Sequence, residues 1–328
     1  MHADTPPLLT QVTRRAMATE FVVMLPPRHV DAVEAVVSAL EQVDAIEAAL
    51  TIYRPDSEIS KVNQLASSQP VEVSDATFRL LQKAVRWSEK TGGAFDVTAG
   101  PLVEAWGFNV RSGKKPSDSS IQTALDHVGF QHIELSPETR TVRFGIMGMS
   151  INLGAIGKGD ALDRIASNLR QNGVESFLIH GGHSSILAAG DQIAGSEQGW
   201  PVGIAHPTKP KRRLGGIRLR NQALATSGSG KQFFHHRGRR FGHVIDPRTG
   251  YPAGDLLSLT VLMESAADAD ACATGLFVRG SAETEGFTVG ETLVPMVRVR
   301  SGSRQDSVEL ACQGEIEWVD PPDLVVSQ

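Results

Sequence analysis

Hydrophobic residues recur at steps of three and four positions in four stretches of the chain, which is the spacing of one face of an α-helix. These stretches predict helices over residues 30–50, 75–90, 152–172 and about 266–278. Ser74 could cap the second helix, and the Gly92–Gly93 pair would stop it. The third stretch begins as a glycine-rich loop and ends at Asn172–Gly173.

Short apolar runs predict strands between these helices. Ile133–Leu135 and Thr141–Phe144 flank a Ser-Pro-Glu-Thr-Arg segment, which predicts a β-hairpin. Further runs cover residues 176–180, 185–189, 202–205, 214–219 and 257–263. The strands come in consecutive groups and do not alternate one by one with helices. We therefore expect an α+β fold, with mixed or antiparallel sheets and packed helices, in preference to a doubly wound α/β sheet.

The 328 residues, of which 41% are hydrophobic, suffice for one large domain or two small ones. No internal repeat or biased linker marks a boundary, and residues 111–120, rich in Ser, Lys and Pro, are the best candidate for a loop excursion. We therefore expect one folded unit over residues 16–318. A flexible N-terminus would cover residues 1–15, and a frayed C-terminus would cover residues 319–328.

The net charge of −5 argues against a nucleic-acid-binding surface, and the basic clusters at 209–213 and 237–240 are interpreted as solvated loops. No uncharged apolar run approaches the roughly 18 residues of a membrane span. The first 19 residues lack both an apolar core of signal-peptide length and a cysteine that could accept a lipid. As written, the chain is expected to be cytoplasmic, or periplasmic if an export signal has been trimmed.

The two cysteines, Cys272 and Cys312, are too few for a zinc site by themselves and form no CxxC spacing. Their number also excludes a disulfide framework. Cys272 lies in an apolar, helix-like run, where we expect it to pack as a small hydrophobic residue.

The segment Thr91–Pro101 ends a predicted helix and opens into a loop. Its glycine pair would let the backbone approach a ligand closely, while Asp96 and Thr98 supply oxygen acceptors and a hydroxyl. An ordinary helix end followed by an Asx turn explains the same residues equally well.

The segment Asn152–Asp160 places three glycines around Lys158 directly before a helix. Backbone N–H groups at a helix N-terminus attract anions, so a phosphate could bind there. The segment is not a P-loop, because Gly159 stands where serine or threonine is required. Its GxxGxG order also fails the dinucleotide-binding pattern.

The segment His243–Gly250 gathers a possible base, a carboxylate and a guanidinium around a forced turn. Val244–Ile245 predicts the end of a short apolar strand, after which Pro247 and Gly250 turn the chain. So many functional groups within eight residues favour a ligand-binding loop, although a solvated turn capped by an aspartate remains the alternative.

Histidine can accept a proton near neutral pH, which makes His243 a candidate base. Thr226 and Ser227 end an earlier run. If the two strand ends lie side by side, these hydroxyls converge with His243, Asp246 and Arg248 on one cleft.

The segment Ala267–Thr274 contains Asp270 and Thr274, four residues apart, which on a helix lie on one face within reach of one ion. A small set of oxygen ligands suits magnesium, which keeps waters and substrate phosphates as its other ligands. A helix start enriched in aspartate for dipole reasons is the alternative interpretation.

Together and in this order, these four segments resemble the FAD:protein FMN transferase family, the ApbE-type flavin transferases once described as thiamine-biosynthesis lipoproteins. Further matches are Met17–Thr19, Tyr53–Ser60 with Asn63, and Gly181–Gly182 after the strand at 177–180. The resemblance runs from about residue 16 to about residue 280.

The resemblance implies a T-fold-related, ApbE-like single catalytic unit. It also implies a transferase that flavinylates proteins by moving FMN from FAD to a threonine or serine hydroxyl of an acceptor protein, with release of AMP. FAD would be the substrate, Mg²⁺ the cofactor and an acceptor flavoprotein the partner.

The resemblance assigns roles residue by residue. His243 would deprotonate the acceptor hydroxyl, while the metal would rest on Asp270, Thr274 and the carbonyl of Gly157. Residues implied to hold the FAD are Met17, Tyr53, Ala94, Phe95, Asp96, Lys158, Asp160, Thr226, Ser227, Val244 and Asp246.

The chain departs from the family pattern at three positions. The family loop usually begins with aspartate and reads Lys-Gly-Tyr, where this chain has Asn152 and Asp160, and its Gly-Gly pair is usually followed by Asp or Asn, where this chain has His183. A negative Asp160 beside a phosphate is unfavourable unless the metal or Lys158 offsets it. Two alternatives therefore stay open: hydrolysis of FAD to FMN and AMP, or FAD binding without catalysis.

Overall fold

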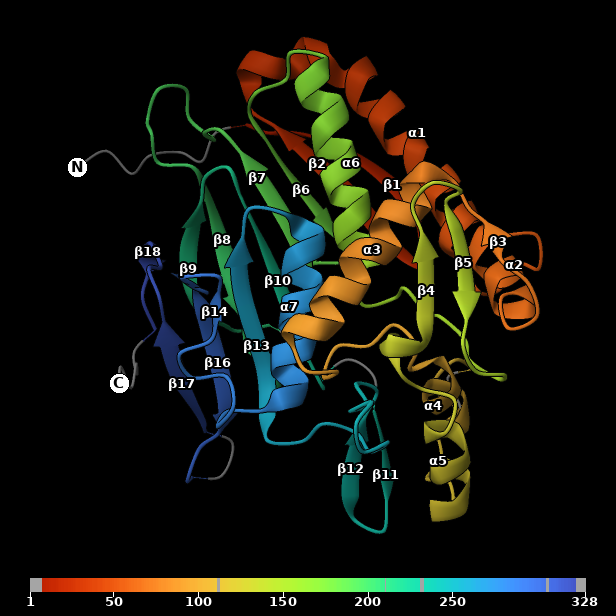
Figure 1. Ribbon diagram of the computed structural model, residues 1–328. Helices are drawn as coiled ribbons and strands as arrows, with labels where there is room; N and C mark the ends of the chain where they lie inside the picture. Colours follow the sequence, from red (N-terminus) through yellow and green to blue (C-terminus); the bar gives the residue numbers. More distant parts are fainter. Residues whose placement is uncertain (1–7, 111–112, 210, 231–232, 305–306, 323–328) are drawn as a thin grey trace.

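The largest element is an eight-stranded sheet in which every neighbouring pair is antiparallel (Figure 1). The computed structural model describes residues 8–110, 113–209, 211–230, 233–304 and 307–322. In spatial order the strands are β1 (Thr10–Ala16), β2 (Thr19–Leu25), β6 (Phe177–Gly181), β7 (Ser185–Ala189), β10 (Gln222–Gly228), β13 (Leu256–Met263), β16 (Met296–Ser301) and β17 (Val308–Gln313).

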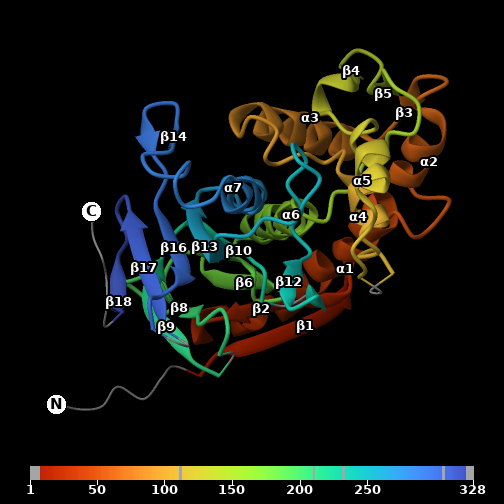
Figure 2. The same ribbon diagram turned by 90° about the horizontal axis from the view of Figure 1, so that it is seen from below.

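Helices cover one face of this sheet (Figure 2). They are α1 (Val33–Leu50), α6 (Gly157–Gln171) and α7 (Ala266–Arg279), and α3 (Asp75–Lys90) packs on α7. Successive strand residues point to opposite faces, so in β6 Phe177 and Ile179 enter the core under the helices, while Leu178 enters a second core behind the sheet. The sheet is therefore buried on both faces over part of its area.

A smaller sheet covers the second core. It consists of β8 (Trp200–Ala205), β9 (Arg213–Leu219) and β18 (Trp318–Asp320), in the order β18-β9-β8. The fully buried Trp200 packs in this core, and its indole N–H donates to the carbonyl of Ala189 at 2.9 Å.

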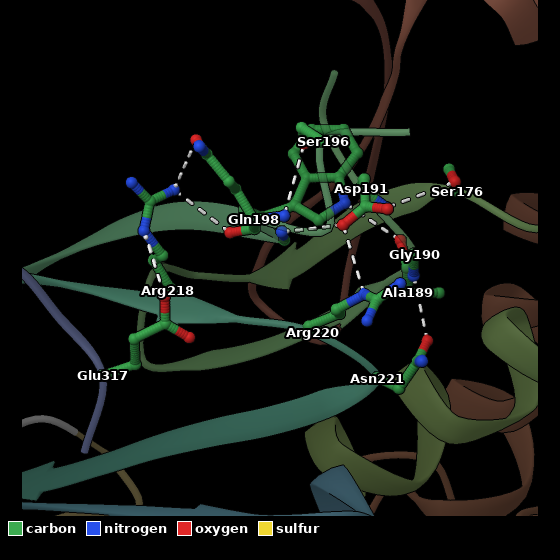
Figure 3. A network of polar contacts seen from close by, with 12 residues as sticks. Ser176, Ala189, Gly190, Asp191, Ser196, Gln198, Arg218, Arg220, Asn221 and Glu317 are labelled. Atoms are coloured by element: carbon green, nitrogen blue, oxygen red, sulfur yellow. Dashed lines mark hydrogen bonds and ion pairs between the residues drawn. The ribbon is translucent and has the colours of Figure 1, made fainter. Parts of the chain in front are cut away.

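A polar network fixes the loop that joins the two sheets (Figure 3). Asp191 accepts from the backbone N–H of Gly199 at 2.8 Å and forms an ion pair with Arg220 at 3.2 Å. Asn221 accepts from the N–H of Gly190 at 2.9 Å. These contacts satisfy backbone groups that no strand pairs, so we assign this network a structural role.

The remaining elements lie beside the helical layer. A three-stranded sheet in the order β3-β5-β4 and an aromatic cluster around Trp106, Phe108 and Phe241 organise them. Their bounds are η1 (Pro27–Ala32), α2 (Glu58–Leu65), β3 (Val71–Glu72), α4 (Gly100–Ala105), α5 (Asp118–Leu125), η2 (Phe130–His132), β4 (Ile133–Ser136), β5 (Thr141–Phe144), β11 (Phe233–His236), β12 (Arg239–Gly242), β14 (Thr288–Val289) and β15 (Thr292–Leu293).

The start of α6 lies in close contact with the start of α7. A Cβ built on Gly159 would lie 2.2 Å from the carbonyl oxygen of Ala266. Asp163 of α6 then reaches across and accepts from the N–H groups of Ala266 and Ala267 at 2.8 and 3.0 Å. A carboxylate at the first turn of a helix satisfies free N–H groups and interacts favourably with the helix dipole.

The predicted α+β class, the four predicted helices and the seven strands predicted within residues 133–263 are confirmed, with ends shifted by a few residues. The strand end predicted at Val244–Ile245 is the exception. Ser74 caps α3 by accepting from the N–H of Thr77. The predicted loop excursion is wrong in its last part, because α5 begins at Asp118 behind the cap Ser117; residues 111 and 112 lie outside the described residues.

The boundaries expected at residues 16 and 318 fall inside paired strands. β1 already begins at Thr10, and β18 continues to Asp320, so the folded unit extends beyond both expected limits. Residues 1–7 and 323–328 lie outside the described residues. Both cysteines are free, and Cys272 is buried in the main core, as expected for a small hydrophobic residue. Within the described ranges, every helix is too short or too polar to cross a membrane.

We predict that Gly159→Ala lowers the free energy of unfolding by about 1–3 kcal/mol, because the added methyl group overpacks a backbone contact. Urea denaturation measures the change. Gly254→Ala is the matched control, since a Cβ there would meet only Pro252 O, at 4.0 Å, and should stay within about 0.5 kcal/mol of the parent. Equal stability of the two variants would show that α6 can move away from α7 without cost.

Candidate active site

The α6–α7 crossing brings Asp270 against the glycine-rich loop. One oxygen of Asp270 accepts from the N–H of Gly159 at 2.8 Å, and the other accepts from the hydroxyl of Ser185 at 2.7 Å. The residue is only 6% exposed. Gly159 and Ser185 therefore fix the position of a carboxylate at the junction of α6, α7 and β7.

The charge of Asp270 is incompletely compensated by the protein. Burial raises the pKa of its carboxyl group, while the positive charge of Lys158 and the hydrogen bonds from Ser185 and Gly159 act in the opposite direction. Among the described residues, no lysine, arginine or histidine forms an ion pair with it. A buried carboxylate usually needs a paired charge or a metal ion, so a cation beside Asp270 fits the site.

Other residues expected at the metal and flavin sites gather around this carboxylate. Thr274, one helical turn after Asp270, has its hydroxyl 3.0 Å from that of Ser227 at the end of β10. A Cβ built on Gly157 would lie 3.3 Å from the Cε of Met17. The structure therefore brings Met17, Gly157, Ser227 and Thr274 to the same end of the helical layer.

Met17 lies in a strained turn. It and Ala18 join β1 to β2, and their φ angles of 51° and 57° lie in the left-handed region that favours glycine. Non-glycine residues in this region cost free energy and cluster at functional sites. Here the turn places Met17 beside the first residue of α6.

The expected metal ligands all present oxygen atoms, and Asp270 supplies the one carboxylate among them. Within the described part of the chain, no group of three or more His, Cys, Asp or Glu residues could hold a metal ion. The expected set of Asp270, Thr274 and the Gly157 carbonyl contains one such residue, which suits a hard cation that keeps water or phosphate oxygens as its other ligands.

The neighbouring Asp268 points away from this site. It accepts from the indole N–H of Trp87 at 2.7 Å and from the ammonium group of Lys83 at 3.0 Å. Burial opposes its ionisation, but these bonds hold the pKa of Asp268 below its usual value. Asp268 therefore ties α7 to α3, and the two aspartates of the motif have different roles.

Asp160 is compensated by a residue that the sequence analysis did not consider. Burial raises the pKa of its carboxyl group, and an ion pair with Arg164, at 2.7 Å on the next helical turn, opposes that effect. Arg164 therefore offsets part of the negative charge of Asp160, in addition to any contribution of the metal or Lys158. Asn152 accepts from the N–H of Gly154 at 2.9 Å, a bond that an aspartate would form equally well.

The loop after α3 is held by its aspartate. Asp96 accepts from the N–H and hydroxyl of Thr98 at 2.8 and 2.7 Å and from the N–H of Phe130 at 2.9 Å. Burial raises the pKa of Asp96, although these bonds favour its charged form. Ala94 and Phe95, also expected to contact FAD, are buried in this structure, and the Phe95 ring belongs to the main core.

The predicted strand end at Val244–Ile245 is wrong, because β12 ends at Gly242 and Ile245 forms only an isolated bridge with Pro252. His243 is the first residue after this strand, and its ring meets that of Phe108 edge to face with centroids 6.5 Å apart. The aromatic cluster therefore helps to position the candidate base.

The turn after His243 is shaped by an internal ion pair. Asp246 accepts from the backbone N–H and Nε of Arg248, both at 2.9 Å, and from its Nη2 at 3.0 Å. Arg248 also lies 3.5 Å from Glu283, just beyond α7. Asp246 thus has a clear structural role, whatever it contributes to a ligand.

The end of β10 does approach this turn, since Arg240 donates to the carbonyl of Ser229 and a Cβ on Gly242 would lie 3.0 Å from the Cβ of Ser229. The hydroxyls of Thr226 and Ser227, which are adjacent in β10, nevertheless point to opposite faces of the sheet. Ser227 faces α7, whereas Thr226 points to the opposite face of the sheet, where its hydroxyl is 2.8 Å from that of Thr260. Thr226 is therefore not brought into the cluster around Asp270.

Two further expected residues lie at the periphery. Tyr53 is 73% exposed, with its hydroxyl donating to the carbonyl of Asn109 at 3.4 Å. Val244 is half-buried against the main core. An exposed aromatic ring can stack on a flat ligand, so the position of Tyr53 is compatible with its expected role.

The sequence analysis missed Ser185, and it noted His183 as a departure from the family pattern without its stacking on His180. His180 is buried in β6, His183 follows in the turn with φ of 62°, and their rings stack with centroids 4.5 Å apart. Burial, followed by the charge of His183, lowers the pKa of His180. The contact of Ser185 with Asp270 joins residues 85 positions apart, so no local signal could have identified it.

Known proteins show the same combination of fold and motifs. A family model described as the ApbE family matches residues 17–293. The FAD:protein FMN transferase of Haemophilus influenzae is 35% identical over 252 residues, which cover 73% of this chain and 72% of the relative.

Solved structures agree with these sequence matches. The ApbE protein of Thermotoga maritima superposes with a TM-score of 0.81 at 27% identity, covering 95% of this chain and 97% of that chain. The flavin transferase ApbE of Vibrio cholerae gives a TM-score of 0.78 at 28% identity, covering 94% and 98% of the two chains.

We predict that Asp246→Asn lowers the free energy of unfolding by about 1–3 kcal/mol, because the amide weakens three hydrogen bonds from Arg248 to a buried carboxylate. Chemical denaturation measures the loss. Glu283→Gln is the control, since this outer partner of Arg248 is exposed and its removal should cost about 0.5 kcal/mol or less. If Glu283→Gln lost more free energy of unfolding than Asp246→Asn, Glu283 and not Asp246 would be the main partner of Arg248.

Proposed function

This chain belongs to the ApbE family and is a flavin transferase, and we propose that it moves FMN from FAD to a threonine or serine hydroxyl of an acceptor protein, with release of AMP. The observation that carries this proposal is the buried Asp270 beside Lys158 at the start of α6. This arrangement combines a place for a cation with an anion-attracting helix end, as a pyrophosphate substrate requires.

We propose Mg²⁺ as the cation, held by Asp270, Thr274 and the carbonyl of Gly157. When bound, it would neutralise negative charge on the pyrophosphate and so favour attack on phosphorus. Lys158 and the N–H groups at the start of α6 contribute positive potential at the same place. Ser185 and Gly159 keep the Asp270 carboxylate in position by occupying one lone pair on each oxygen.

His243 is proposed to accept the proton of the acceptor hydroxyl. An unassisted hydroxyl is a weak nucleophile near neutral pH, and a positioned base removes its proton as the bond to phosphorus forms. The proton would pass from the hydroxyl oxygen to an imidazole nitrogen of His243, and AMP would leave with the electrons of the broken P–O bond. Asp246 and Arg248 orient this loop, and Phe108 supports the imidazole ring.

We predict that His243→Ala retains FAD binding but slows flavin transfer by about 10²–10⁴-fold, the usual contribution of a general base. Fluorescence titration measures FAD binding, and in-gel flavin fluorescence of the acceptor measures transfer. His236→Ala, which removes an exposed histidine from the adjacent β11, should transfer at the parental rate. Near-normal transfer by His243→Ala would exclude His243 as the base.

We predict that Mg²⁺ raises the melting temperature of the parent protein and has little effect on Asp270→Asn. A ligand that binds only the folded state at about 100 times its Kd stabilises by about 2.7 kcal/mol. Asp268→Asn is the matched control, because it should melt earlier through loss of its Trp87 and Lys83 contacts and still respond to Mg²⁺.

Chelation provides the complementary measurement for the same site. EDTA should stop transfer, and Mg²⁺ should restore it. If Asp270→Asn responds to Mg²⁺ like the parent, or if transfer survives EDTA, the proposed metal site is wrong.

One incubation separates transfer from the two alternatives. The protein is mixed with FAD and Mg²⁺, with and without an acceptor peptide containing a target threonine, and the products are separated by chromatography. Flavin covalently bound to the peptide, together with AMP, supports the proposed transfer. Free FMN and AMP in both reactions would indicate hydrolysis, and unchanged FAD would indicate binding without catalysis.

A further inference from the structure

Arg298 carries a positive charge that is buried without a carboxylate partner. It lies on β16 and is 9% exposed. Its Nη1 donates to the carbonyl of Ser281 at 3.1 Å and to the hydroxyl of Thr284 at 3.3 Å, while its Nε is buried without a hydrogen-bond partner. Among the described residues, no aspartate or glutamate forms an ion pair with it. Buried charges are normally paired, so this guanidinium requires an explanation.

A structural role accounts for only part of this arrangement. Ser281 follows Gly280 at the end of α7, where a positive charge interacts favourably with the helix dipole. That role uses Nη1 alone. A planar guanidinium has five N–H donors. A lysine or a neutral donor side chain could make the same contacts near the end of α7, so these contacts alone do not require an arginine.

Arg298 also lines a cavity of about 270 Å³, which we call the Arg298 cavity. A water molecule occupies about 30 Å³ of liquid volume, so this cavity has room for a small molecule. Leu256, Ala282 and Ala311 contribute apolar walls. The cavity therefore combines a buried, incompletely satisfied cation with enclosing hydrophobic surface, which is how proteins usually bind small ligands.

The other charges around the Arg298 cavity leave the guanidinium available to an anion. Arg300 and Glu309 also line the cavity, but they neutralise each other at 2.9 Å. Glu285 is exposed, whereas Arg298 is buried. The positive charge therefore lies deep and the unpaired negative charge lies toward solvent.

We propose that the Arg298 cavity binds the oxyanion group of a small molecule, a carboxylate or a phosphate, against the guanidinium of Arg298. Arginine recognises both groups through parallel N–H···O bonds. This site is separate from the proposed flavin site. Asp270 and Arg279 lie nine residues apart on α7, which is about 13 Å along the helix axis. The guanidinium of Arg298 donates to Ser281 and Thr284, which follow the end of α7.

The test is a thermal-shift titration of the full chain with inorganic phosphate, acetate and glycine, at an ionic strength held constant with chloride. At least one of the three should raise the melting temperature with saturation. Arg298→Gln should weaken that response about tenfold or more, because charged hydrogen bonds are lost. The double variant Arg300→Gln/Glu309→Gln is the matched control, since it removes an exposed ion pair, leaves the net charge of the cavity unchanged and should respond like the parent.

The three probes distinguish the sources of the oxyanion. A response to phosphate alone identifies a phosphate-bearing ligand, and a response to acetate and glycine identifies a carboxylate. Preference for glycine over acetate indicates that Glu285 receives the ammonium group.

A crystal soaked in selenate provides a measurement that does not depend on the stability of Arg298→Gln. An anomalous peak should appear beside the Arg298 guanidinium. The proposal is overturned if no probe gives a saturable shift and no peak appears, or if Arg298→Gln responds to every probe as the parent does.

Discussion

The close crossing of α6 and α7 at Gly159 is the constraint on which the rest of the site depends. A residue without a side chain lets the two helix starts approach until the backbone N–H of one reaches the carboxylate of the other. Asp163 then uses the same proximity to satisfy the first N–H groups of α7. Packing and electrostatics therefore reinforce each other at one point, and the helix start proposed to bind phosphate is held beside the carboxylate proposed to bind a cation.

The sheet provides the rigid support for this crossing. Ser185 on β7 and Ser227 on β10 each reach one side chain of α7, so the helix is located by contacts from two neighbouring strands as well as by α6. The second core behind the sheet keeps those strands from moving, because side chains such as Leu178 pack against β8 and β9. Functional side chains thus lie on elements that are packed from more than one direction, which is the usual requirement for a precise site.

Local patterns in the sequence predicted the four long helices and the main-sheet strands β6, β7 and β13, but not β1, β2, β16 or β17. The reasons for these differences are physical. Helix periodicity and caps act within a few residues, so α3 and its cap Ser74 could be identified directly. β1 was missed because polar residues such as Thr10 and Arg14 occupy its half-buried positions, which leaves no alternation of apolar and polar residues, and because its pairing with β2 depends on a turn of two non-glycine residues. Such a turn gives no compositional signal.

The sequence identified the segments that form the candidate site, but it did not identify the contacts between side chains of different segments. Asp270 was recognised from its spacing to Thr274, whereas its partners Ser185 and Gly159 come from other elements. Strand alternation separates Thr226 from Ser227, which a motif written as consecutive letters cannot show. Similarly, the partner that compensates Asp160 lies one helical turn away, outside the motif.

The two halves of the proposed site belong to different hydrophobic clusters. Asp270 is embedded among residues of the main core, whereas the chain on either side of His243, at Phe241 and Ile245, packs in the aromatic cluster around Trp106. Segments with separate cores can open with different local free energies before the whole protein unfolds. Moderate heat or denaturant can therefore release the His243 loop while the helical layer stays folded, so loss of activity would precede the main unfolding transition.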